Sequence, residues 1–323
     1  MNKKNPILKS YQRVEWDRQR HYKIDEARQY PSSTTILGIK VKPAIPPWAS
    51  KMAAQYASFK NAELVSDFFT TAPKYRTKEN LLKLLTGEEY IVDVKGAPWR
   101  KSEAAMDIGT LAHDMVSEFH KAEIDLREQH NEEFSASEAS DWFKTKLSNL
   151  FGKKGDWFKT DKSGELSSKW KKDDDRRLTN CIKAFLEWRQ EVGFVIVSTE
   201  FTVFTDKHKY AGTVDALGYV SGKLTLVDYK TSSGIWPEHD LQVASYLNAL
   251  LWMIENKLAK FEDVPNEMMI VNFNKEGTLD HKWVKCYDEA LAVFLGLKEA
   301  FIANQIWESV SKANKAKGNV IEK

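Results

Sequence analysis

Three charged residues stand in two short segments in the second half of the chain. Asp228 and Lys230 belong to TLVDYKTS, and Asp215 belongs to GTVDALG, thirteen residues earlier. Both segments are rich in residues that favour β-strands, where ionised side chains are costly unless they are paired or bind a metal. Two carboxylates and a lysine therefore indicate either a metal site or a structural ion-pair network on a solvent-facing sheet surface.

The spacing of these residues favours a shared face. Side chains alternate along a strand, so Asp228 and Lys230 project to one side and Tyr229 to the other. A tight turn at Ser221-Gly222 would pair the two strands and could bring Asp215 beside Asp228. Adjacent carboxylates repel each other unless a cation lies between them, and Mg²⁺ or Mn²⁺ prefers such oxygen ligands. A lysine beside that ion could orient water or neutralise charge on a phosphate, which is the chemistry of phosphodiester hydrolysis.

The elements that must position these residues follow from local sequence patterns. Runs of β-branched and apolar residues predict an antiparallel three-stranded meander, and a long amphipathic helix and a buried strand follow it. Expected strands cover residues 194–204, 211–220, 223–229, 268–273 and 281–285, after an amino-terminal hairpin at 21–24 and 29–30. Expected helices begin at Ser32–Thr35 and cover 48–69, 78–85, 101–121, 176–192, 241–252 and 287–307.

Composition sets the class of protein. The 323 residues carry 48 basic and 46 acidic side chains, so any nucleic-acid binding must come from local patches. One such patch covers residues 144–177, where aromatic residues interleave with Lys and Arg; it could follow a phosphate backbone or be a solvated insertion. No apolar run approaches the roughly 20 residues of a membrane span, and no signal peptide is evident. We therefore expect a cytoplasmic protein that does not bind a membrane.

Five motifs in order resemble the PD-(D/E)XK nuclease superfamily, specifically its RecB-like and Cas4-like exonuclease branch, which includes phage-type enzymes. The motifs are Gly109-Thr110-Leu111-Ala112-His113, Glu200, Gly212-Thr213-Val214-Asp215, Asp228-Tyr229-Lys230 and Gln242-x-x-x-Tyr246, spread over about 140 residues. YPSSTTIL near the amino terminus is also similar to a Ser-Val-Thr-x-Ile-Leu stretch of that branch, with Ser33 in place of valine. No Pro-Asp pair occurs; Val214-Asp215 stands there instead, as is frequent in this branch.

The resemblance implies a role for each matched residue. Metal ligands would be His113, Glu200, Asp215, Asp228 and the main-chain carbonyl of Tyr229, and Lys230 would be the catalytic lysine. Gln242 and Tyr246, one helical turn apart, would position the scissile strand. Thr231, Ser232, Ser33 and Thr34 are further candidates for DNA contact, and filling a loop explains Thr231 and Ser232 equally well. His120 lacks metalloprotease spacing and is expected at the surface.

The resemblance also implies the fold and the function. We expect an α/β nuclease core over residues 101–310 with a basic insertion at about 125–177, a hairpin and helical region over 1–100 that covers the DNA path, and a flexible tail over 311–323. The activity would be that of a Mg²⁺- or Mn²⁺-dependent exonuclease acting at DNA ends in phage-like recombination, replication or repair. A single-strand-annealing or recombination protein would be a candidate partner.

Some alternatives stay open. An endonuclease of the same fold differs only in how the DNA channel is closed, and a non-catalytic DNA-binding protein could have kept the fold. The clustered carboxylates favour an enzyme over a pure DNA binder, because they repel phosphates. Two cysteines, Cys181 and Cys286, cannot supply the four that an iron–sulfur cluster of this branch needs, so we expect none.

Overall fold

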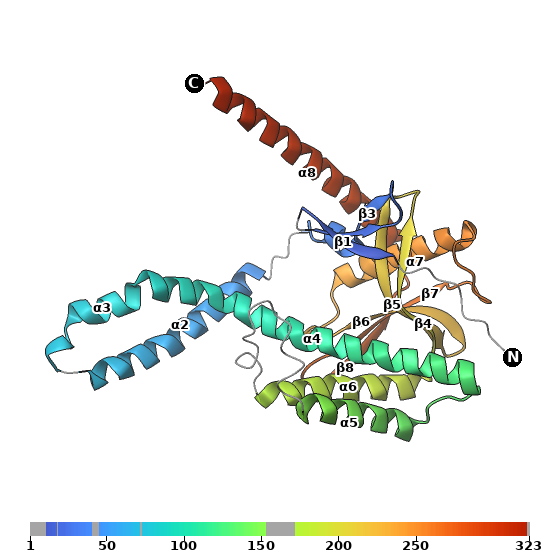
Figure 1. Cartoon of the computed structure of the whole chain (residues 1–323), viewed down its shortest axis with the longest axis horizontal. Helices are drawn as coiled ribbons and strands as arrows, with labels where there is room; N and C mark the ends of the chain where they lie inside the picture. The colour runs from blue at the N-terminus through green and yellow to red at the C-terminus, as the bar shows by residue number, and fades with distance from the viewer. Residues whose placement is uncertain (1–10, 18, 41–44, 72, 153–171, 322–323) are drawn as a thin grey trace. The chain divides into compact units, whose positions relative to one another are not determined.

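The structure is a computed structural model and describes residues 11–17, 19–40, 45–71, 73–152 and 172–321. Its contacts divide into two compact units, which are unit 1 (Met1–Lys40 and Gly109–Lys323) and unit 2 (Val41–Ile108). The elements of unit 2 are α2 (Ile45–Thr70), the 3₁₀ helix η1 (Pro73–Tyr75), α3 (Lys78–Thr86) and the first part of α4 (Glu88–His130). The remaining elements belong to unit 1 (Figure 1): β1 (Gln12–Trp16), β2 (Gln19–Lys23), β3 (Gln29–Pro31), α1 (Ser33–Leu37), α5 (Ala136–Gly152), α6 (Lys172–Val192), β4 (Val195–Thr205), β5 (Tyr210–Val220), β6 (Lys223–Lys230), α7 (Pro237–Glu255), β7 (Glu267–Phe273), β8 (Leu279–Trp283) and α8 (Tyr287–Ile321).

A five-stranded mixed sheet is the centre of unit 1, with strand order β4-β5-β6-β7-β8. β4, β5 and β6 form the predicted antiparallel meander, and β7 lies parallel to β6. Parallel neighbours require a crossover connection, and α7 supplies it. The α/β core that the sequence predicted, with a meander, a helix and a further strand, is therefore confirmed.

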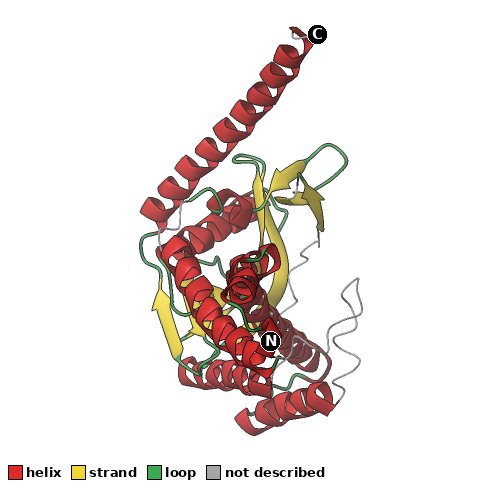
Figure 2. Cartoon of the chain, turned by 90° about the vertical axis from the view of Figure 1, so that its left-hand side faces the viewer, coloured by secondary structure: helices red, strands yellow, loops and turns green. Residues whose placement is uncertain are grey.

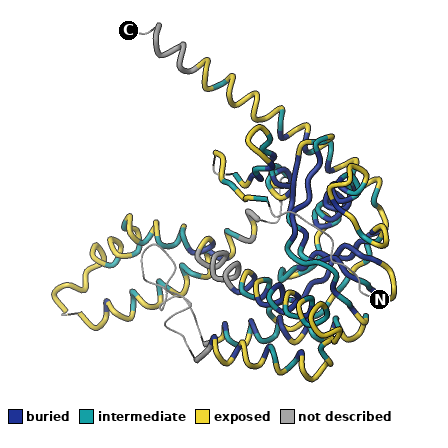
Figure 3. Tube along the Cα trace, turned by 45° about the vertical axis from the view of Figure 1, so that its right-hand side comes forward, coloured by how far each residue is buried: buried dark blue, intermediate teal, exposed yellow. Residues whose placement is uncertain are grey.

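The central strands β6 and β7 are buried on both faces. α7 packs against β4, β5, β6 and β7, whereas α6 packs against β7 and β8. Val203, Leu226 and Ile270 have no exposed surface, as the dark blue strands in Figure 3 illustrate. Strands enclosed in this way tolerate charged side chains only where a partner or a ligand compensates them.

The amino-terminal hairpin of the sequence prediction is part of a three-stranded antiparallel sheet. β2 and β3 are the expected strands, and β1, which was not predicted, pairs with β2 so that Arg13 lies opposite Tyr22. α1 follows β3 directly, and Ser32 caps it by accepting a hydrogen bond from the Thr35 N–H at 3.0 Å. An isolated bridge between Ser32 and Ala211 joins this segment to β5.

Unit 2 is helical, as the sequence predicted for this part of the chain. Pro46 and Pro47 were expected to precede α2, but they lie in its first turn, where backbone N–H groups need no helical acceptor. α4 is much longer than predicted, since it contains 43 residues and continues through Pro98. Large apolar side chains on these helices are exposed, including Phe59 and Trp99. The proposed covering of a DNA path by residues 1–100 stays a prediction.

Unit 1 ends in a long helix, α8, that was predicted to stop near residue 307. Phe294 and Phe301 of α8 are buried in the core, whereas Trp307 and Val310 are exposed where the helix extends away from the sheet (Figure 2). The stretch Tyr287–Asn314 is long and apolar enough to cross a membrane by length and composition, and 22% of its most apolar window is buried in this structure. Core helices also pass this test, and the buried phenylalanines place the first half of α8 in the core.

The basic insertion predicted at about 125–177 is described only in part. Its described portions are helical: the end of α4, α5 and the first turns of α6. Residues 153–171, which include the aromatic residues Trp157, Phe158 and Trp170, lie outside the described residues.

Candidate active site

The candidate site lies where β5 and β6 separate. Their ladder runs from Val220↔Lys223 to Ala216↔Val227 and stops there, so the next opposed positions are Asp215 and Asp228. The N–H of Tyr229 lies beyond the end of the ladder and donates to Oδ2 of Asp215 at 2.7 Å. The register therefore places Asp215 and Asp228 at opposed positions of the two strands, as the sequence suggested it could.

Asp228 begins a chain of polar contacts that crosses from β6 to α7. Its carboxylate is ion-paired with the ammonium of Lys230, and both side chains lie on the same side of the strand. Lys230 Nζ also donates to Oε1 of Gln242 at 3.1 Å, and Nε2 of Gln242 donates to the Tyr246 hydroxyl at 2.8 Å. The structure thus joins four of the residues that the sequence singled out.

Burial makes the negative charges of Asp228 and Asp215 unfavourable. Asp228 is 1% exposed, and burial raises its pKa to about 6, with the neighbouring Asp215 adding to the rise and Lys230 opposing it. Burial likewise raises the pKa of Asp215, while Lys230 and the Tyr229 N–H oppose that shift. Two neighbouring carboxylates whose proton affinity is raised, one buried and one half-buried, are poised to accept a cation.

Glu200 reaches the same place from β4. The pairs Thr199↔Ala216 and Phe201↔Val214 flank it, so its position on β4 is opposite Asp215. Its φ of 49° lies in the left-handed region, which is unusual for a residue other than glycine and is common at functional sites. Burial raises its pKa to about 7, and the charge of Asp215 contributes to the rise.

His113 approaches the carboxylates from α4. Its Nδ1 lies 3.8 Å from Oδ2 of Asp215, and burial, assisted by the charge of Lys230, lowers its pKa to about 4. A neutral imidazole with a free lone pair can ligate a metal. Gly109, one turn earlier, allows the close approach of α4, because a Cβ there would lie 2.6 Å from Oγ1 of Thr231.

The donor set fits a divalent cation, although the ligands are not gathered into a closed cluster. Among the described residues, no three His, Cys, Asp or Glu side chains are arranged closely enough to hold an ion. The enclosed Oδ2 of Asp228 contacts Lys230, and Oδ2 of Asp215 accepts one N–H bond. Carboxylate oxygens retain unused lone pairs in both cases, which hard cations favour.

Two site residues escaped the sequence analysis, and both lie in unit 1. Arg13 of β1 donates to Oγ1 of Thr213 at 2.9 Å, and its guanidinium lies 3.6 Å from Glu200. The Tyr22 hydroxyl shares the same Thr213 oxygen at 2.8 Å. No local pattern marks Arg13, which is 187 residues away from Glu200 along the chain. Thr213 belongs to a matched motif, but nothing in the sequence identified its partners.

A tight contact fixes Tyr246 over β5. A Cβ added at Gly212 would lie 2.2 Å from Cε1 of Tyr246, so only glycine leaves room for this ring. The first residue of Gly212-Thr213-Val214-Asp215 therefore has a packing role that the sequence did not reveal. It allows the ring of Tyr246 to lie beside the strand that carries Asp215.

The four further residues proposed to contact DNA differ in their surroundings. Ser33 is fully buried, and its hydroxyl contacts the Ala211 carbonyl at 3.3 Å and Ser245 at 3.0 Å, which indicates a structural role. Thr34 is exposed. Thr231 packs against α4, and its carbonyl accepts a bond from Lys275 at 2.8 Å; Ser232 bonds within its own loop to Gly234.

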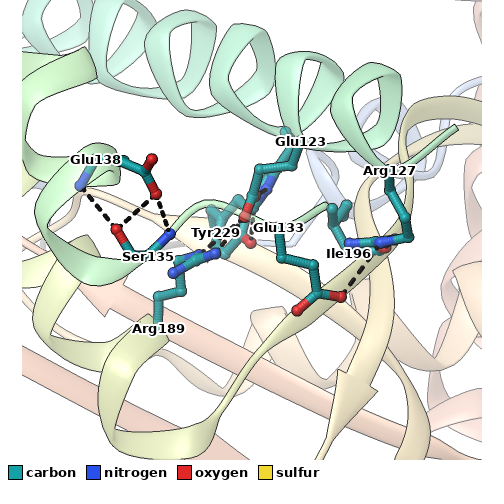
Figure 4. Close-up of polar contacts among 9 residues, drawn as sticks. Glu123, Arg127, Glu133, Ser135, Glu138, Arg189, Ile196 and Tyr229 are labelled. Carbon is teal, nitrogen blue, oxygen red and sulfur yellow. Dashed lines mark hydrogen bonds and ion pairs between the residues drawn. The ribbon is translucent and has the colours of Figure 1, made fainter. Parts of the chain in front are cut away.

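The surface position expected for His120 is wrong. This histidine is fully buried, with hydrogen bonds to Glu123 at 2.9 Å and to the Tyr229 hydroxyl at 2.8 Å. Arg189 of α6 is ion-paired with Glu123, and Figure 4 shows the three labelled side chains Glu123, Arg189 and Tyr229 brought together from α4, α6 and β6. Hydrogen bonds to Glu123 and Tyr229 compensate the burial of this polar ring. Tyr229 is distant in sequence, so a local pattern cannot reveal it.

One comparison with known proteins identifies a family. A family model described as the PD-(D/E)XK nuclease superfamily matches residues 89–315. The match includes β4 to β8, α7 and every residue singled out above as a candidate metal ligand. A comparison with curated proteins finds no match.

Proposed function

Because the chain belongs to the PD-(D/E)XK nuclease superfamily, we propose that it is a divalent-metal-dependent deoxyribonuclease that hydrolyses phosphodiester bonds. The observation that supports this most strongly is the meeting of Asp215 and Asp228 at the end of the β5–β6 ladder, with Lys230 beside them. A purely structural ion pair with Lys230 would need one carboxylate rather than two.

Five groups would hold the metal. They are the carboxylates of Asp215, Asp228 and Glu200, the main-chain carbonyl of Tyr229 and the imidazole of His113. When bound, a divalent cation neutralises the carboxylates and polarises a phosphoryl oxygen. The raised pKa values of Asp228 and Glu200, about 6 and about 7, reflect the unfavourable charge that the cation would offset.

The remaining chemistry belongs to side chains that the structure already aligns. Lys230 is oriented by Asp228 and by Oε1 of Gln242, so its ammonium is available to stabilise negative charge on the reacting phosphate. Gln242 and Tyr246 lie on one face of α7, where the amide and the hydroxyl can hold the phosphate backbone of the strand to be cleaved.

Arg13 supplies a second cation to the same site. Its side chain is 51% exposed, and its bond to Thr213 directs the guanidinium toward Glu200. Guanidinium groups with unused donors bind phosphates bidentately. We assign Arg13 to the phosphate next to the scissile bond.

The finer proposal is an exonuclease that acts at DNA ends in phage-like recombination, replication or repair, with Mg²⁺ or Mn²⁺ as the cofactor. The ordered motifs that resemble the RecB-like exonuclease branch support it, from His113 through Tyr246. We also propose that the protein acts in the cytoplasm, alone or with a single-strand-annealing or recombination partner.

The decisive experiment measures loss of end-labelled linear DNA and of covalently closed circular DNA, each single- and double-stranded, with Mg²⁺, Mn²⁺ or EDTA. We expect metal-dependent loss of linear DNA only. Asp228→Asn and Lys230→Ala should each reduce the rate by at least about 100-fold, because the first removes a charged metal ligand and the second removes a cation that stabilises negative charge in the transition state.

Each result has a defined meaning. Cutting of closed circles would replace the exonuclease with an endonuclease. DNA binding without cleavage under all metal conditions would favour a non-catalytic DNA-binding protein. Cleavage by Asp228→Asn at the wild-type rate would assign Asp228 to a structural ion pair.

A further inference from the structure

Tyr229 takes part in the candidate site through its backbone N–H and carbonyl, whereas its side chain is buried on the opposite face of β6. Its N–H holds Asp215, and its carbonyl is a candidate metal ligand. Its side chain is 2% exposed, and its ring contacts His120 of α4 and Phe185 of α6. The hydroxyl meets Nε2 of His120 at 2.8 Å.

Proton positions along this chain of contacts follow from its far end. Glu123 accepts hydrogen bonds from the guanidinium of Arg189, including one from Nε at 3.1 Å, so it is held as a carboxylate and can only accept. His120 Nδ1, 2.9 Å from Glu123, must therefore carry the hydrogen. Its Nε2 is left as the acceptor for the Tyr229 hydroxyl. The four side chains form one oriented relay, Arg189–Glu123–His120–Tyr229.

The relay also sets the register of α4 against β6. His113 and His120 are seven residues apart on α4, so they lie on one face of the helix. Both rings lie next to Tyr229, with centroid distances of 6.4 Å and 5.9 Å. A sliding of α4 that moved His120 off the Tyr229 hydroxyl would also move His113 away from Asp215.

We propose that this relay is a positioning device for the metal site: it holds the Tyr229 backbone and the His113 imidazole at the spacing that the cation requires. The inference rests on the proposed function. Apolar side chains of similar volume could fill the same space without costly desolvation, so a network of buried polar groups indicates a requirement for orientation. His120, Glu123 and Arg189 are positioning residues, since none of them reaches the carboxylates.

The test uses two matched tyrosine variants. Tyr229→Phe removes the hydroxyl that ends the relay. Tyr210→Phe removes another buried hydroxyl, which bonds to the Ser245 carbonyl at 2.9 Å and to Asn248 at 2.7 Å, outside the relay. Binding of Mn²⁺ alone to the metal-free full chain is measured by titration calorimetry, and thermal midpoints are measured in EDTA.

We expect Tyr229→Phe to weaken Mn²⁺ binding by about 10-fold or more, the range typical for the outer partners of metal ligands. Tyr210→Phe should lower the thermal midpoint to a similar extent and leave Mn²⁺ affinity within about twofold of the wild type. Two variants of His120 distinguish loss of the hydrogen bond from misfolding. His120→Leu should weaken Mn²⁺ binding as Tyr229→Phe does. His120→Gln, whose amide oxygen can accept the tyrosine proton, should restore most of the Mn²⁺ affinity.

One result would overturn the inference alone, and a different one would show that the proposed function fails. Wild-type Mn²⁺ affinity in both Tyr229→Phe and His120→Leu, with only their midpoints lowered, would reduce the relay to a packing feature. If the wild type itself bound no Mn²⁺ and cleaved no DNA, the proposed function would fail, and the relay would lose its role with it.

Discussion

Asp228 is a residue whose environment limits the stability of the metal-free protein. Burial raises its pKa from 3.8 to about 6, so the folded chain binds a proton more tightly than the unfolded chain does. The stability linked to this proton is fully present below about pH 4 and is lost as the pH rises through about 6. In the metal-free protein at pH 7, an ionised Asp228 therefore opposes folding.

The matching prediction compares the wild type with Asp228→Asn in EDTA. The variant should be the more stable protein at pH 7, and its advantage in the free energy of unfolding should shrink as the pH falls from 7 to 4. Denaturant titrations at several pH values measure this difference. An advantage that stayed constant with pH would mean that Asp228 does not titrate in this window.

At the scale of an element, the amino-terminal sheet contacts the site through Arg13 and Tyr22, and Arg13 is the charged one of the two. Arg13→Ala should lower kcat/KM by about 10-fold, as expected for one charge-assisted phosphate contact, and reduce the salt dependence of DNA binding by about one unit of slope. Arg28→Ala is the control, since Arg28 lies in the turn between β2 and β3 of the same sheet and pairs instead with Asp25 and Asp206. Equal effects of the two changes would mean that the sheet is needed but that Arg13 contacts no phosphate.

The elements of the core could be predicted because each has a local signature. Alternating and apolar runs fixed the strands around Asp215 and Asp228, and the Ser221-Gly222 turn fixed their pairing. What escaped depends on contacts between distant segments. Arg13 lies in a short strand that becomes recognisable only when β2 and Thr213 bind it, and His120 is buried because Glu123 and Arg189 compensate its polarity.

At the scale of the whole molecule, metal binding should stabilise one unit of the chain. All candidate ligands belong to unit 1, so Mg²⁺ at about 100 times its Kd should stabilise that unit by about 2.7 kcal/mol. Scanning calorimetry with Mg²⁺ and with EDTA should show a higher midpoint for the transition of unit 1. Asp228→Asn should not respond. A metal-induced shift retained by this variant would place the ion elsewhere.

The turn between β5 and β6 lies five residues or more from Asp215 and Asp228, yet its length determines whether they face each other. Ser221 and Gly222 adopt φ values of 50° and 77°, which a two-residue hairpin requires. Because side chains alternate along a strand, one inserted residue would shift the register and turn Asp215 toward the opposite face from Asp228. Surface loops usually tolerate insertions, but this one is a spacer whose length the distant carboxylates dictate. An insertion at Ser221-Gly222 should therefore disrupt the pairing of Asp215 with Asp228 even though the turn itself lies outside the site.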